Sequence, residues 1–269
     1  YIDRDKNVNL IHVINNKFKV FRFGDAIQIS TGDQHIAVIR KEGNKSNLYT
    51  WGFGKFGPLG HGNEENILDT PTRVKFKGKK QPYIWGYNGF QKIGTNSLYI
   101  TKPHLLKHKK KFVQICLSEA FLVAVSTEGN IYMWGKSSYK LFCINQKDYK
   151  PSKALEIIVK YKGKEKVKQV KCGVTHVLVL THSNKVFSFG ANEYGQLGLD
   201  YRNTLLPRKV FIPVIDDEIK QISCGSFHSA ALTWSGKLFL WGSNSYSEMG
   251  VNKDKLEKVK FPSQIFTNK

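Results

Sequence analysis

Four groups of residues in this sequence have types and spacings that could support chemistry. Gly52-Phe53-Gly54-Lys55-Phe56-Gly57 fits the GxGxxG pattern of phosphate-binding loops. Three histidines stand in similar settings, GDQH, GVTH and GSFH, and three imidazoles can hold zinc. Four cysteines offer thiolates for a metal or for disulfides. Dense lysine runs offer positive charge for an anionic partner. The histidines are His35, His176 and His228.

An internal repeat decides how these groups are interpreted. Glycine follows an aromatic residue at Trp51, Trp85, Trp134, Phe189 and Trp241, and the spacings between these aromatics are 34, 49, 55 and 52 residues. Five residues after each comes a second aromatic, and three residues later an apolar one. Periods near fifty that hold several strand-like runs are typical of β-propeller blades. The second aromatics are Phe56, Phe90, Tyr139, Tyr194 and Tyr246, and the apolar residues are Leu59, Ile93, Phe142, Leu197 and Met249.

Each repeat predicts a four-stranded antiparallel blade, so the fold class is all-β. In the last repeat, residues 219–224, 228–234 and 237–242 alternate with turns, and an outer strand follows near 258–262. Proline belongs on an edge strand, where its missing N–H is not needed. The prolines near the predicted outer strands are Pro71, Pro103, Pro151, Pro207 and Pro262.

The domain prediction is one propeller over residues 1–269, in a chain of 41% apolar residues with no apolar run long enough to span a membrane. The second repeat has room for only two strands. Residues 1–19 hold a closing or residual strand, at 8–14. Because the chain begins with Tyr1 and shows no secretory signal, we interpret it as a piece of a longer protein. The repeats are predicted at about 20–76, 77–108, 109–160, 161–214 and 215–266.

The repeat turns the glycine loop and the histidines into structural positions. A GxGxxG site needs a helix after it and an acidic residue about twenty positions on. Here Gly57 is followed by more of the repeat, which predicts strands and not a helix. Each histidine starts the second strand of its blade, and Phe121 fills that place in another repeat. A packing role tolerates phenylalanine there, and a ligand role does not. We predict no metal site.

The cysteines are interpreted in the same way. Cys116, Cys172 and Cys224 stand in QIC, VKC and ISC, which we take as equivalent places that the fold holds apart. Without CxxC spacing, neither a disulfide nor a zinc cluster is expected. The residues are predicted to be small buried hydrophobes in a reducing compartment.

Net charge is +21, from 42 basic and 21 acidic residues, and it predicts an anionic partner. The alternative, that the lysine runs are solvated loops, stays open because arginines and aromatics do not interleave with them. No Ser-His-Asp, Cys-His or paired-carboxylate spacing is present, so we expect neither chemical catalysis, nor a cofactor, nor a small-molecule substrate. The partner-binding candidates are Lys107, Lys109, Lys110, Lys111, Lys160, Lys162, Lys164 and Lys166, and a further run holds Lys77, Lys79 and Lys80.

Residues 49–74, 187–210 and 224–232 resemble repeats of the regulator of chromosome condensation family. The resemblance implies a propeller, seven-bladed in that family, whereas five repeat cores are visible here. It also implies guanine nucleotide exchange on the small GTPase Ran and attachment to chromatin, hence an intracellular, nuclear protein. Some members absorb light through paired tryptophans with arginines, but the tryptophans here head blade cores.

An alternative function is a scaffold propeller within a larger signalling, kinase-associated or ubiquitin-ligase protein. The resemblance implies that an exchange factor carries a protruding β-wedge. The nearest candidate for a wedge here is the segment 157–166, which is short. Loop length therefore favours the scaffold function, whereas the positive charge favours the nuclear exchange factor.

Overall fold

The computed structural model describes residues 8–14, 17–23, 25–31, 35–55, 57–62, 67–76, 82–89, 95, 97–106, 108–119, 121–135, 155–157, 165–250 and 257–265. Every helix or strand assigned in these residues is a β-strand. Across the same residues, no helix has the length and apolar character needed to cross a membrane. The strands form two compact units, Tyr1–Gly89 with Ser97–Leu106 and Phe90–Asn96 with Lys107–Lys269.

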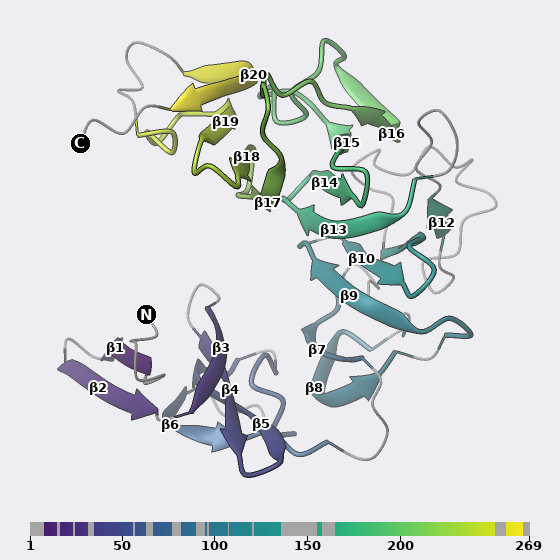
Figure 1. Cartoon of the computed structure of the whole chain (residues 1–269). Helices are drawn as coiled ribbons and strands as arrows, with labels where there is room; N and C mark the ends of the chain where they lie inside the picture. Colours follow the sequence, from purple (N-terminus) through teal and green to yellow (C-terminus); the bar gives the residue numbers. More distant parts are fainter. Residues whose placement is uncertain are drawn as a thin grey trace. The chain divides into compact units, whose positions relative to one another are not determined.

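The first unit holds one four-stranded antiparallel sheet and two strand pairs (Figure 1, purple to blue). The pair β7–β8 contains Trp85-Gly86 and Pro103, so it supplies the third and fourth strands predicted for the abbreviated repeat. β1 is the strand predicted at 8–14, and its partner β2 was not predicted. The elements are β1 (Val8–Ile14), β2 (Lys17–Phe23), β3 (Ala26–Thr31), β4 (His35–Glu42), β5 (Lys45–Phe53), β6 (Ile67–Arg73), β7 (Tyr83–Tyr87) and β8 (Tyr99–Leu105).

The second unit holds three four-stranded antiparallel sheets, which we number blades 3, 4 and 5 after the repeats. Their first strands are neighbours, β9 against β13 and β13 against β17, as Figure 1 shows from teal to yellow-green. Blade 3 comprises β9 (Phe112–Leu117), β10 (Phe121–Ser126), β11 (Ile131–Gly135) and β12 (Leu155–Ile157). Blade 4 comprises β13 (Val167–Cys172), β14 (His176–Thr181), β15 (Val186–Ala191) and β16 (Asn203–Lys209). Blade 5 comprises β17 (Ile219–Cys224), β18 (His228–Thr233), β19 (Leu238–Ser243) and β20 (Lys258–Ile265).

Blade 4 is packed on both faces. Every residue of β14 and β15 is buried. One face joins a core with blade 3 through Val177 and Phe187, and the other joins a core with blade 5 through Leu178 and Val186. Near-continuous apolar runs are what a doubly covered sheet requires. The strand sequences HVLVLT and VFSFGA therefore follow from the position of blade 4 between two neighbours.

The aromatic-glycine pairs are explained by contacts between successive sheets. The Trp241 indole N–H donates to the Gln196 carbonyl of the preceding sheet at 3.0 Å. In the first unit, the Trp85 indole N–H donates to the Pro58 carbonyl at 2.8 Å. Pro58 and Gln196 occupy the same repeat position, one residue before the buried Leu59 and Leu197. Trp85 and Trp241 thus each lie under the loop that the motif builds in the sheet before it.

A glycine of the motif is needed where this loop touches the next sheet. Gly198 has φ +67°, in the left-handed region that glycine favours. A Cβ at this position would lie 3.0 Å from the Trp241 indole nitrogen and 3.0 Å from a methyl of Val210. The glycine that follows the apolar residue therefore permits close packing between blades 4 and 5.

The predicted equivalence of the cysteines is wrong for Cys116. In the strand pairing, Cys116 takes the place of Lys171 and Ser223, one residue before the place shared by Cys172 and Cys224. Successive side chains on a strand point to opposite faces, so this offset turns Cys116 toward blade 4. The backbone N–H of Cys172 donates to the Cys116 sulfur at 3.0 Å. These two thiols are therefore neighbours and are not held apart.

Candidate partner-binding site

The topology places the lysine-rich segments of the second unit at one end of its sheets. The segment that precedes each first strand lies at the same end as the hairpin between the second and third strands, because consecutive strands are antiparallel. We call this end the hairpin face. It consists of residues 108–111, 165–166 and 216–218, which precede β9, β13 and β17, and of the hairpins at 126–130, 181–185 and 233–237.

Backbone hydrogen bonds fix each preceding segment to the hairpin of its own blade. The N–H of Thr127 donates to the Lys111 carbonyl at 3.0 Å, and the N–H of His182 donates to the Lys166 carbonyl at 2.9 Å. In blade 5, the N–H of Trp234 donates to the Glu218 carbonyl at 3.0 Å. Lys111, Lys166 and Glu218 therefore hold equivalent, backbone-anchored positions.

Predicted lysines from two repeats meet around the hairpin of blade 3. The Lys110 ammonium lies 3.5 Å from the Glu128 carboxylate on this hairpin. At the other side of the hairpin, the Val167 N–H donates to the Gly129 carbonyl at 3.2 Å, which brings the adjoining Lys166 against Gly129. The structure thus brings Lys110, Lys111 and Lys166 together where blades 3 and 4 adjoin. We call the boundary between two neighbouring blades a seam.

Glu128 is the acidic residue within this group. A hydrogen bond from the Ser126 hydroxyl, with a smaller contribution from Lys110, lowers the pKa of its carboxyl. The carboxylate offsets one positive charge, that of Lys110. Lys109, Lys111 and Lys166 are exposed, and none of them forms an ion pair with another residue that the structure describes.

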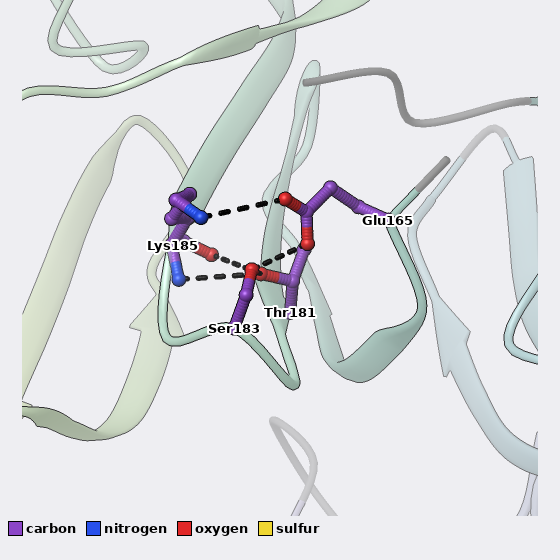
Figure 2. Close-up of polar contacts among 4 residues, drawn as sticks. All are labelled: Glu165, Thr181, Ser183 and Lys185. Carbon is purple, nitrogen blue, oxygen red and sulfur yellow. Dashed lines mark hydrogen bonds and ion pairs between the residues drawn. The ribbon is translucent and has the colours of Figure 1, made fainter. Parts of the chain in front are cut away.

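The hairpin of blade 4 is held by side chains, as Figure 2 shows. The Lys185 ammonium lies 3.5 Å from Glu165, which precedes β13, and the Ser183 hydroxyl donates to the same carboxylate. The Thr181 hydroxyl accepts from the Lys185 backbone N–H at 3.2 Å. Glu165 therefore ties its segment to the hairpin and places Lys166 beside it.

The equivalent place in blade 5 is acidic. Asp216, Asp217 and Glu218 precede β17. The Ser235 hydroxyl donates to the Asp217 carboxylate at 2.5 Å, and hydrogen bonds from Ser235 and Thr233 lower the pKa of Asp217 to about 2. The positive charge on the hairpin face is thus concentrated at the seam of blades 3 and 4.

Half of the predicted partner-binding residues are placed by the structure. Lys109, Lys110, Lys111 and Lys166 are all exposed on the hairpin face. The other predicted residues and the run at 77–80 lie outside the described residues, as does most of the segment 157–166. Those other residues are Lys107, Lys160, Lys162 and Lys164.

The histidines begin second strands as predicted, at β4, β14 and β18. His176 is fully buried, and its Nε2 lies 2.9 Å from the Ser229 hydroxyl of blade 5. Burial, with a smaller effect of His228, lowers the pKa of His176 to about 3. This imidazole is therefore neutral and joins two blades. Within the described part of the chain, no group of three histidine, cysteine or acidic residues is placed to hold a metal ion.

The glycine loop lies between two strands of one sheet. It begins at the end of β5, and the next element in the described residues is the antiparallel strand β6. The Thr50 hydroxyl donates to the Leu59 carbonyl at 2.7 Å, as Ser188 does to Leu197 in blade 4. These glycines therefore form a repeat loop that a hydroxyl of the preceding strand anchors.

Sequence reasoning missed the residues that join the first strands. The Gln114 side chain accepts from the Val170 N–H at 3.0 Å and donates to the Val170 carbonyl at 3.1 Å. Gln169 accepts from the Ile222 N–H at 3.0 Å. Glutamine at one position of β3, β9, β13 and β17 was the available signal.

Comparison with known proteins identifies the repeat. The regulator of chromosome condensation (RCC1) repeat matches residues 45–82 and 183–232, and a second form of that repeat matches 167–196 and 219–248. The chain belongs to this repeat family. Prp20p from Saccharomyces cerevisiae aligns over 89% of this chain and 65% of its own with a TM-score of 0.73 at 21% identity. The fold is thus a β-propeller of four-stranded antiparallel blades.

Curated relatives extend well beyond the matched region. The chain is 31% identical over 245 residues to serine/threonine-protein kinase Nek9 of Xenopus laevis, which is 88% of this chain and 22% of the kinase. It is 28% identical over 268 residues to the ultraviolet-B receptor UVR8 of Arabidopsis thaliana, 88% of this chain and 58% of the receptor. The chain therefore spans less than two thirds of either relative.

Proposed function

We propose that the chain is a non-enzymatic protein-binding propeller whose hairpin face binds an acidic partner at the seam of blades 3 and 4. The observation that carries the proposal is that Lys109, Lys110, Lys111 and Lys166 are exposed around one hairpin, with Glu128 pairing with Lys110. Backbone hydrogen bonds anchor Lys111 and Lys166, so binding at these positions costs little main-chain conformational entropy. Exposed lysines on a fixed surface attract phosphates and carboxylates over several ångströms.

The partner proposed first is a Ran-type small GTPase, with guanine nucleotide exchange as the activity, and/or chromatin. Family membership supports this proposal, and the Prp20p structure is described together with the binding of that protein to Gsp1p and histones. The acidic phosphates of nucleosomal DNA suit the net charge of +21. A nuclear location follows as part of the same proposal.

Binding to reconstituted nucleosomes across a salt series tests the chromatin proposal. The triple variant Lys109→Ala, Lys110→Ala, Lys111→Ala is expected to bind at least about tenfold more weakly at low salt and with a shallower salt dependence. The control removes three exposed lysines of the first unit, Lys41, Lys45 and Lys75. If both triple variants lose the same affinity, nucleosome binding depends on the overall positive charge and not on a particular site, and the proposal fails.

Release of labelled GDP from Ran tests the exchange activity. If the chain at micromolar concentration accelerates GDP release, and the same triple variant accelerates it less, the result supports an exchange factor. No acceleration, while nucleosome binding persists, removes exchange and leaves a chromatin-binding propeller.

A scaffold propeller within a larger signalling protein is the second candidate. It is favoured by the match of 88% of this chain to 22% of a protein kinase. In that function, the hairpin face binds an acidic surface of a partner domain, and neither GDP release nor nucleosome binding is observed.

A further inference from the structure

A groove in the second unit is lined by the loop 198–200, by residues at 209–213 from the end of β16 onward, and by residues 261–262 of β20. Figure 1 shows β16 in green and β20 in yellow. The volume of the groove is about 450 Å³. Two phenylalanines and two prolines contribute to its lining and make it largely apolar. The lining includes Phe211, Pro213, Phe261, Pro262, Lys209 and Asp200.

The phenylalanines are exposed because of the strand-like alternation of the chain around them. Val210 and Ile212 are buried between blades 4 and 5, which leaves the intervening Phe211 76% exposed. On β20, Pro262 is buried and the adjacent Phe261 is 49% exposed. Isolated apolar side chains on a surface are ordinary, whereas two large aromatics lining one groove indicate a contact site.

Basic side chains border the groove. Lys209 lines it and is exposed. The Lys260 ammonium lies 5.3 Å from the centre of the Phe261 ring. Asp200, the acidic lining residue, is ion-paired with Lys260. A second cavity of about 590 Å³ shares Asp200 and is lined also by Glu193 and by the basic residues Arg202, Lys258 and Lys260.

We propose that the groove binds an acidic segment of a partner protein that inserts a bulky apolar side chain between Phe211 and Phe261. The aromatic walls suit the apolar anchor, and the lysine border suits carboxylates beside it. The site lies on the segment that follows β16 and on β20, and goes beyond the proposed function of the hairpin face. A segment of this kind is a different ligand from nucleosomal DNA, which offers no apolar anchor to such a groove.

A labelled synthetic peptide provides the probe. Fluorescence anisotropy is measured with an acidic peptide that carries one phenylalanine and one leucine among aspartates and glutamates. Two matched peptides replace the apolar pair by serines or the acids by lysines. We expect micromolar binding of the first peptide only, weakened about tenfold or more by Phe211→Ser with Phe261→Ser and severalfold by Lys209→Ala with Lys260→Ala.

Control variants keep the result interpretable. Tyr246→Ser changes an aromatic that is 89% exposed outside the groove and should leave peptide affinity unchanged. The Lys109, Lys110 and Lys111 triple variant should also bind the peptide normally, which separates this proposal from that of the hairpin face. Circular dichroism and thermal unfolding establish that the groove variants remain folded.

Three outcomes overturn the proposal. Equal binding of the serine-substituted peptide would show a purely electrostatic surface. Unchanged affinity in the folded double phenylalanine variant would place the peptide elsewhere. Self-association of the chain that Phe211→Ser abolishes would assign the groove to a second copy.

Discussion

The seam between blades 3 and 4 and the seam between blades 4 and 5 have similar backbone contacts but differ in chemistry. At both seams a glutamine of one first strand binds the backbone of the next, through Gln114 and Gln169. On the hairpin face, lysines precede β9 whereas Asp216, Asp217 and Glu218 precede β17. The contacts that build the propeller recur, and the charges that could select a partner do not. Function should therefore be sought where the two seams differ.

The largest loss of stability is expected on substitution of Trp241, the leading aromatic of the repeat in blade 5. Trp241→Ala is predicted to lower the free energy of unfolding by about 3–5 kcal/mol, because it removes a fully buried indole. Phe189 fills the same place in blade 4 without an indole N–H, so Trp241→Phe should cost only about 1–2 kcal/mol, mainly for the bond to Gln196. Urea unfolding measures both. Equal losses would show that the hydrogen bond, and not the packing, carries the contact.

The two seams should also differ in how the free energy of unfolding depends on pH, because a buried histidine lies at one of them and a phenylalanine takes its place at the other. Burial lowers the folded-state pKa of His176 to about 3, below its ordinary value of 6.5. The stability that the neutral imidazole contributes is therefore fully present above pH 6.5 and is lost as pH falls toward 3. The free energy of unfolding should drop by about 1.4 kcal/mol per pH unit in this window. Phe121 fills the equivalent place in blade 3, so His176→Phe should remove this part of the slope. Urea titrations from pH 7.5 to 5 provide the measurement, and an unchanged slope contradicts the assignment.

A third prediction tests the similarity of the seams. Gln114→Ala and Gln169→Ala should each lower the free energy of unfolding by about 1–3 kcal/mol, because each leaves backbone groups of the next first strand without their partner. Gln221→Ala changes an exposed glutamine at the same repeat position and serves as control. A loss in only one of the two variants would mean that the seams are not built alike.

The smallest stability effect belongs to the charges of the hairpin face. Glu128→Gln should change the free energy of unfolding by less than about 1 kcal/mol, because the ion pair with Lys110 is solvent-exposed. The same change removes one negative charge beside three lysines and should strengthen nucleosome binding about two- to threefold at low salt. Weaker binding would show that Glu128 itself contacts the partner.

Much of the fold could be predicted from the sequence because each blade carries its own signals. Apolar runs and turn glycines mark the strands, and proline marks the outer strand in β6, β8, β16 and β20. The cysteine offset was missed because the alignment was made on Cys116 itself. Had Gln114 and Gln169 been aligned instead, the one-residue difference would have been visible, since pairing resumes at the glutamine after a bulge in each first strand.

The candidate site was less predictable for a physical reason. Lysine runs between strands predict exposed segments, and Lys109, Lys110, Lys111 and Lys166 are indeed exposed. That Lys110 and Lys166 flank one hairpin depends on packing between blades, which a single repeat does not encode. Exposure of Phe211 likewise depends on which side of its segment blade 5 covers, since Val210 and Ile212 are buried there.

The most direct measurement exchanges the chemistry of the two seams. Lys109, Lys110 and Lys111 occupy the places of Asp216, Asp217 and Glu218, as the backbone bonds to Thr127 and Trp234 show. The variant Lys109→Asp, Lys110→Asp, Lys111→Glu therefore gives blade 3 the acidic side chains that precede β17 in blade 5. Its nucleosome affinity is measured against the unaltered chain at low and high salt.

We predict a folded variant whose affinity falls at least about tenfold at low salt, with the difference shrinking as salt rises. An affinity equal to that of the unaltered chain at every salt concentration would contradict the claim that the seam of blades 3 and 4 binds the partner.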